Sequence, residues 1–66
     1  MQTTTVDMWQ NLRSGTDLAD RVEQRALREF EQKHPDRHAL RVRWLSASPR
    51  EGGGRWVELA LDWVQR

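Results

Sequence analysis

The sequence predicts an α+β domain in the order β-α-β-β, with a three-stranded sheet in the strand order 1-3-2 and one amphipathic helix on one face. Three observations predict this fold. Apolar residues recur at helical spacing between residues 16 and 34, and they alternate with polar residues over 38–46 and again over 55–64. A chain of 66 residues is too short for two hydrophobic cores, so residues 1–66 are expected to form a single small domain.

The first strand is predicted over residues 3–9, which are rich in β-branched side chains. Its alternation is weaker than that of the later strands. Thr4, Val6 and Met8 share one face, whereas Asp7 and Trp9 share the other. Residues 11–15 would then turn into the helix. The pattern leaves open whether this strand pairs within its own chain or with a neighbouring copy.

A helix is predicted over residues 16–34. Ser14 and Thr16 are both suitable N-cap residues, and Asp17 places negative charge near the positive end of the helix dipole. Pro35 ends the helix because it disfavours the helical conformation of the preceding residue. Apolar residues occupy about half of the helical wheel: Leu18, Ala19, Val22, Ala26, Leu27 and Phe30.

The segments 38–46 and 55–64 are predicted to form a β-hairpin, because residues 47–54 between them consist of turn-forming residues. An antiparallel pairing can make one face apolar and pair charges on the other. The pairs expected are Trp44 with Val57, Val42 with Leu59, Leu40 with Leu61 and Arg43 with Glu58, with Arg41 diagonally near Asp62.

A right-handed crossover makes the first strand parallel to the second, and the hairpin makes the third antiparallel to the second. The third strand then fills the gap between the other two, in a mixed or antiparallel sheet. The predicted core is Val6, Met8, Leu18, Val22, Ala26, Phe30, Leu40, Val42, Trp44, Val57, Leu59, Leu61 and Trp63.

Four tryptophans in so short a chain cannot all be buried completely. Trp44 and Trp63 share strand parity with the core, whereas Trp9 and Trp56 share parity with charged residues. The sheet face opposite the helix has no cover in this fold. We therefore expect a contact surface on that face, formed by Trp9, Arg41, Arg43, Leu45, Trp56 and Glu58.

Candidate catalytic and metal sites are weak. The chain has no Cys or Tyr, and no readable Ser-His-acid arrangement, so an enzyme is not expected and no catalytic residue is assigned. His34 and His38 are separated by Pro35, and a zinc site needs three or four convergent ligands, so no metal and no cofactor is predicted. The run Gly52–Gly54 lacks the Lys-Ser/Thr of a phosphate-binding loop and is interpreted as a hairpin turn.

Composition sets further limits. Ten arginines and one lysine nearly balance ten acidic residues, and a net charge of +1 exerts little long-range attraction on nucleic acid or acidic lipid. The absence of Cys, of a signal-peptide pattern and of a membrane-spanning stretch predicts a cytoplasmic protein. A core this small is marginal, which favours self-association.

The element order, the length and the single helix over three strands resemble the dodecin family, small flavin-binding proteins that assemble into hollow shells. The resemblance spans most of the chain but is topological. The Gly-Thr-Ser that usually opens the family's helix is replaced by Ser14-Gly15-Thr16, and its aromatic-Gln-Val pattern by Trp56-Val57-Glu58. Trp44 is loosely similar to the family's flavin-stacking Trp. Topology alone does not carry the function over.

The function predicted is a non-enzymatic protein-interaction module that self-associates or docks a protein partner through the exposed sheet face. We expect a homo-oligomer or a protein partner, and no membrane. The alternatives are a dodecin-like oligomer that binds flavin, a small inhibitor of a host system of the kind that phages encode, and a less favoured single-stranded nucleic-acid binder. The last would use Arg21, Arg25 and Arg28 with stacking tryptophans, although acidic residues are interleaved with these arginines.

Overall fold

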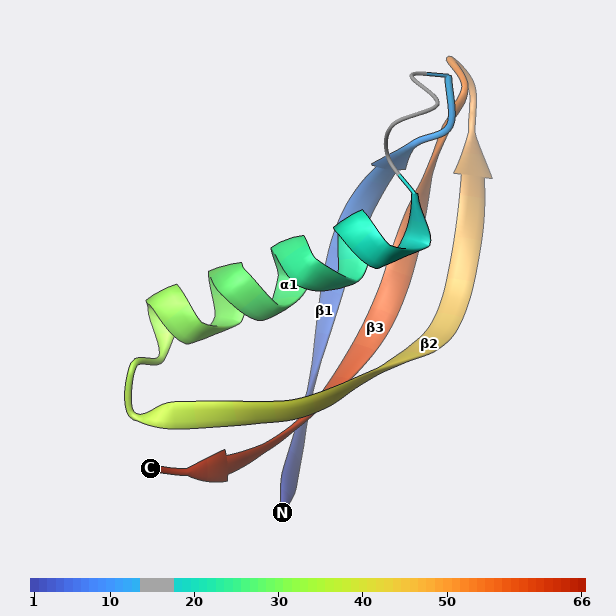
Figure 1. The fold of residues 1–66 in the computed structure, drawn as a ribbon. Coiled ribbons are helices and arrows are strands. Elements are labelled where there is room, and N and C mark those ends of the chain that lie inside the picture. The colour runs from blue at the N-terminus through green and yellow to red at the C-terminus, as the bar shows by residue number, and fades with distance from the viewer. Residues whose placement is uncertain (14–17) are drawn as a thin grey trace.

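The computed structural model describes residues 1–13 and 18–66, and these form one helix on one face of a three-stranded sheet (Figure 1). The elements follow the order β-α-β-β that the sequence predicts. Their bounds are β1 Gln2–Asn11, α1 Ala19–Lys33, β2 Arg37–Arg50 and β3 Gly54–Gln65.

The sheet has the predicted order, with β3 between β1 and β2 and antiparallel to both. Strand β1 pairs with β3 of its own chain over its whole length, from Gln2 opposite Trp63 to Asn11 opposite Gly54. This answers the question that the sequence leaves open about the first strand. Only β3 lies between two strands, so the edges of β1 and β2 bound the sheet.

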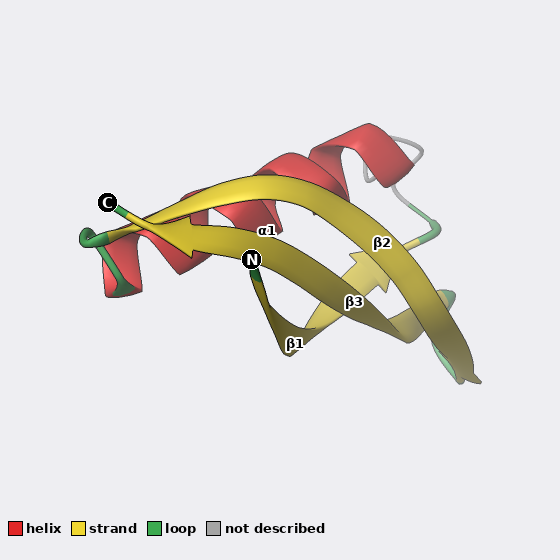
Figure 2. Ribbon diagram, turned by 90° about the horizontal axis from the view of Figure 1, so that it is seen from below, coloured by secondary structure: helices red, strands yellow, loops and turns green. Residues whose placement is uncertain are grey.

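Helix α1 lies across one face of the sheet, and no element among residues 1–13 and 18–66 covers the opposite face (Figure 2). It buries Val22, Ala26 and Phe30, which are four residues apart and therefore share one side of the helix. Leu18 was expected in this core, but it is 61% exposed. It is the N-cap residue with an extended backbone, so the helical wheel does not apply to it. The predicted caps Ser14 and Thr16, with Asp17, lie outside the described residues.

The core is formed by the residues of β3 whose side chains point toward the helix. Its odd-numbered residues Val57, Leu59, Leu61 and Trp63 are buried under the helix, as predicted. Met8 joins them from β1, and Val6, Val42 and Trp44 pack at the margin with half-buried side chains. From the other face, Ala60 and Asp62 are also buried.

The hairpin register differs from the prediction by three residues next to the turn, by two between the two β-bulges of β2, and by one at the start of β2. Trp44 lies opposite Leu59 and Val42 opposite Leu61. The bulges place Leu40 between residues paired with Trp63 and Asp62, and Leu45 between residues paired with Leu59 and Glu58. An extra residue in one strand interrupts the alternation of faces. Leu40 therefore stays 51% exposed instead of joining the core.

The hairpin turn is also shorter than the predicted linker 47–54, because β2 continues to Arg50 and only residues 51–53 remain between the strands. Gly52 and Gly53 have φ angles of 93° and 80°, in the left-handed region that glycine tolerates best. Within the described residues, no helix is long and apolar enough to cross a bilayer.

Candidate functional site

The most distinctive feature of the open sheet face is a pair of neighbouring tryptophans. Trp9 on β1 lies directly opposite Trp56 on β3, with the ring centroids 5.4 Å apart in an edge-to-face arrangement. The two side chains are 37% and 44% exposed. Within the described residues, neither indole N–H donates a hydrogen bond, so both remain available to a binding partner. The structure thus brings together the two tryptophans that parity placed on this face.

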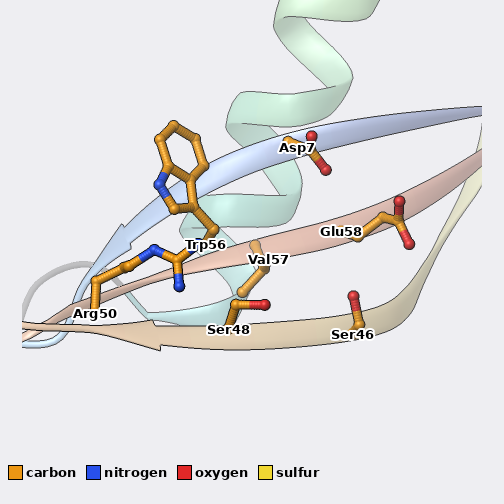
Figure 3. Close-up of a pocket in the computed structure, with 7 residues that line it drawn as sticks. All are labelled: Asp7, Ser46, Ser48, Arg50, Trp56, Val57 and Glu58. Atoms are coloured by element: carbon orange, nitrogen blue, oxygen red, sulfur yellow. The ribbon is translucent and has the colours of Figure 1, made fainter.

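A shallow groove of about 510 Å³ runs beside Trp56. Figure 3 shows the side chains that line it, and they come from all three strands. Trp56 and Arg50 lie at one end, and Asp7 and Glu58 at the other. Ser46 and Ser48 supply hydroxyl groups from β2. The groove therefore offers an aromatic surface, hydrogen-bonding groups and charges of both signs within one space.

Asp7 and Glu58 form a pair of like charges directly opposite each other on β1 and β3. The carbonyl of Trp9 accepts a hydrogen bond from Arg25 of the helix, so it points away from β3. By alternation, Asp7 also occupies a non-hydrogen-bonded position, where paired Cα atoms lie only about 4.5 Å apart. Opposed like charges destabilise a sheet. Within the described residues neither carboxylate has a basic partner, so the pair presents an uncompensated negative site.

Arg41 and Arg43 are held by the chain's own Asp62. The Asp62 carboxylate accepts hydrogen bonds from Arg41 Nε at 2.5 Å, from Thr3 Oγ1 at 2.7 Å, and from Arg43 Nε and Nη2 at 3.1 and 3.0 Å. These bonds from Arg41, Thr3 and Arg43 hold the pKa of Asp62 well below its usual range. The predicted pairing of Arg43 with Glu58 is wrong, because Arg43 lies opposite Ala60, and Ser46 lies opposite Glu58.

The two guanidinium groups nevertheless face solvent on one side. The side chains of Arg41 and Arg43 are 61% and 45% exposed, while that of Asp62 is buried beneath them. Two positive charges on one carboxylate leave this end of the face with an excess of positive charge. The open face therefore has a basic region around Asp62 and an acidic region at Asp7 and Glu58, four residues apart along β3.

Leu45, the remaining residue of the predicted surface, protrudes from the second bulge and is 47% exposed. Four further residues line the groove but lie outside the predicted contact surface: Asp7, Ser46, Ser48 and Arg50. Asp7 shares parity with Trp9, so the alternation in β1 was a usable signal. The other three belong to or follow the second bulge, in a segment that the sequence divides between strand and turn.

The remaining candidates lie elsewhere. Trp44, the residue similar to a flavin-stacking Trp, is half-buried against the helix, and its indole N–H donates to Glu23 Oε1 at 2.5 Å. Arg21 and Arg28 are exposed on the helix, whereas Arg25 reaches the backbone of β1. Within residues 1–13 and 18–66, no three His, Asp or Glu side chains are grouped so that they could hold a metal ion.

Gly54 controls the position of Trp9. It lies opposite Asn11 and is buried, and a Cβ atom at this position would overlap with the six-membered ring of Trp9. We expect Gly54→Ala to displace Trp9 from Trp56 and to cost about 1–3 kcal/mol of stability, because overpacking forces neighbours to move. The exciton signal of the indole pair in the far-ultraviolet circular dichroism spectrum should fall.

Gly52→Ala is the matched control for that change. A Cβ at Gly52 would meet no atom within 4 Å, so only the positive φ angle resists the substitution. This variant should lose some stability but keep the exciton signal. Equal signals in Gly54→Ala and the wild type would show that Gly54 does not hold the tryptophan pair together.

No known protein family, curated protein or solved structure matches this chain. The functional argument therefore depends on the geometry of the open face.

Proposed function

We propose that this chain is a non-enzymatic interaction module that binds a protein, either a second copy of itself or another protein, through the open sheet face. The observation that carries the proposal is the exposed pair Trp9–Trp56, on a face that no element of the described residues covers. Tryptophan is enriched among the few residues that dominate binding energy at interfaces, each worth at least about 2 kcal/mol when truncated.

The size of the face supports this role. The molecule measures 39 × 19 × 16 Å, so its broad side is comparable to the area of about 800 Å² that each partner contributes to a standard interface. The two indoles and Leu45 supply apolar area there, and the surrounding charges supply the polar rim typical of interfaces.

The charge pattern indicates what kind of partner surface fits. Asp7 and Glu58 need a positive group, and an Arg or Lys side chain could reach them while its aliphatic part covers Trp56. The exposed guanidinium groups of Arg41 and Arg43 attract a carboxylate in the same way. A second copy of the chain would present both kinds of group.

Trp56→Ser tests the proposal. We expect this change to weaken assembly by about 30-fold or more, in line with the loss of a central aromatic anchor. Native mass from light scattering measures assembly, and far-ultraviolet circular dichroism measures whether the helix persists. Arg28→Ser, on the solvent-exposed side of the helix, is the control and should assemble like the wild type. An unchanged mass for Trp56→Ser would contradict the proposal.

A further inference from the structure

Strand β1 presents unpaired backbone groups along the edge of the sheet. The Trp9 carbonyl points away from β3, since it accepts from Arg25, whereas the Leu12 N–H donates to Gly53 O at 2.7 Å on the β3 side. Antiparallel pairing alternates these directions residue by residue. The N–H and C=O groups of Thr3, Thr5 and Asp7 therefore point outward, and within the described residues they have no partner there.

This edge has few of the features that protect edges in natural sheets. Bulges, prolines and charged side chains commonly block the addition of another strand. The edge of β2 has two bulges and Pro49. In contrast, β1 pairs in unbroken register over ten residues, contains no proline and has Asp7 as its one charged residue. Of the two edges, only β1 is regular enough to accept a strand.

A groove of about 300 Å³ lies beside the same edge, between β1 and the helix. Thr4, Val6 and Met8 line it from the strand, Ala26 and Phe30 line it from the helix, and the charged residues Asp7, Glu29 and Lys33 also line it. Thr4 and Val6 are half-buried, so each can bury more apolar area if a neighbour covers it. An added strand would thus gain backbone hydrogen bonds and side-chain contacts together.

We propose that the β1 edge is a strand-addition site for β1 of a second copy, which joins two sheets into one six-stranded antiparallel sheet across a two-fold axis at Thr5. Arg25 donates a hydrogen bond to the carbonyl of Trp9. The outward backbone N–H and C=O groups that a second strand could pair with are therefore those of Thr3, Thr5 and Asp7. A two-fold axis at Thr5 uses all of them, because Thr5 then faces Thr5 of the second copy, and Thr3 faces its Asp7.

The sequence of β1 favours this register. With the axis at Thr5, Val6 of each copy lies opposite Thr4 of the other, and both residues line the groove. No two residues of like charge lie directly opposite each other across this interface. An axis at Asp7 would instead oppose two carboxylates, which destabilises a strand pair. The interface is isologous, so it closes as a dimer.

This site uses none of the side chains of the tryptophan pair, so it can operate with or without binding at the open face. Thr5→Pro tests it directly. Proline is tolerated on an edge strand where its N–H would face outward, so the monomer should fold. Each dimer would lose two hydrogen bonds, and dimerisation should weaken by about tenfold or more in sedimentation measurements.

Thr5→Lys is the second variant. It keeps the backbone N–H, and the Thr5 side chain is exposed, but two lysines would meet on the axis of the dimer. This variant should also dimerise more weakly, and salt should partly restore its affinity. Gln32→Lys, at an exposed position of the helix, adds the same charge elsewhere and should dimerise like the wild type.

Amide hydrogen exchange gives the decisive readout. In concentrated wild-type protein the Thr5 amide should exchange slowly, and in dilute wild-type protein it should exchange quickly. The amide of residue 5 in Thr5→Lys should exchange faster than in the wild type at the same concentration. A wild type that stays monomeric at millimolar concentration, or a dimer whose Thr5 amide exchanges at the dilute rate, would overturn the proposal. If Trp56→Ser leaves a dimer with a protected Thr5 amide, the strand-addition site stands and the open face is not the interface.

Discussion

Trp63→Ala is expected to lower the free energy of unfolding by roughly 3–5 kcal/mol. The Trp63 ring packs against Phe30 of the helix with centroids 6.1 Å apart, and the Arg37 guanidinium lies 4.2 Å from the Trp63 centroid. The indole N–H donates to Thr4 Oγ1 at 3.0 Å. One side chain therefore links β3 to the helix, to β1 and to the start of β2, and its removal leaves a cavity at their junction.

That loss is large for this domain. Small proteins have total stabilities of about 0.05–0.15 kcal/mol per residue, so a chain of 66 residues has little to spare. Urea unfolding followed by circular dichroism should show Trp63→Ala partly or wholly unfolded without denaturant. Trp63→Phe, which keeps an aromatic ring against Phe30 but loses the bond to Thr4, should be affected less.

Trp56→Ala provides the matched control, because Trp56 is on the same strand but on the opposite face and is 44% exposed. Surface substitutions usually change stability by no more than about 0.5 kcal/mol, and the lost contact with Trp9 adds about 0.5–1.5 kcal/mol. Equal losses for the two alanine variants would contradict the assignment of Trp63 to the core and Trp56 to the surface.

This division of the tryptophans was predictable from the sequence because β1, β3 and the helix contain no irregularity. In a strand without a bulge, side chains alternate between the two faces, so the face of one residue predicts the face of every other. Val57, Leu59 and Leu61 therefore fix Trp63 under the helix, and Trp56 on the other side. The strand order 1-3-2 is confirmed for a related reason, since a hairpin joined to a crossover leaves few arrangements.

The second strand could not be predicted in the same detail. Its bulges at Leu40 and Leu45 are flanked by an alternation that looks regular in the sequence, and each bulge shifts the register by one residue. The first bulge moves Leu40 out of the core. The turn at residues 51–53 displaces the register further, so Arg43 bonds to Asp62 instead of Glu58. The wrong register also made the predicted charge pairing at the site wrong. Glu58 was expected to pair with Arg43, but in the structure Glu58 lies beside Asp7 without that arginine.

The second large effect expected is a dependence of folding stability on pH, caused by the hydrogen bonds around Asp62. Hydrogen bonds from Arg41, Thr3 and Arg43 lower the pKa of Asp62 in the folded protein, whereas the unfolded chain should have the ordinary value of about 3.9. A group whose folded pKa is depressed stabilises the fold above its unfolded pKa, and that contribution is lost as pH falls through the folded pKa. Wild-type stability should therefore decline below about pH 4.

Asp62→Asn isolates this contribution. Asparagine keeps the size of the side chain but removes the negative charge, so Arg41 and Arg43 are left at a buried neutral amide, and stability at neutral pH should fall markedly. The difference in unfolding free energy between wild type and variant, measured by urea unfolding in steps from neutral pH downward, should be constant above about pH 5 and shrink below about pH 4. Glu58→Gln, on the same strand and face, should show no loss at neutral pH, because it relieves the repulsion with Asp7. A wild-type advantage over Asp62→Asn that stayed constant into strong acid would mean that the ionised carboxylate does not hold the two arginines.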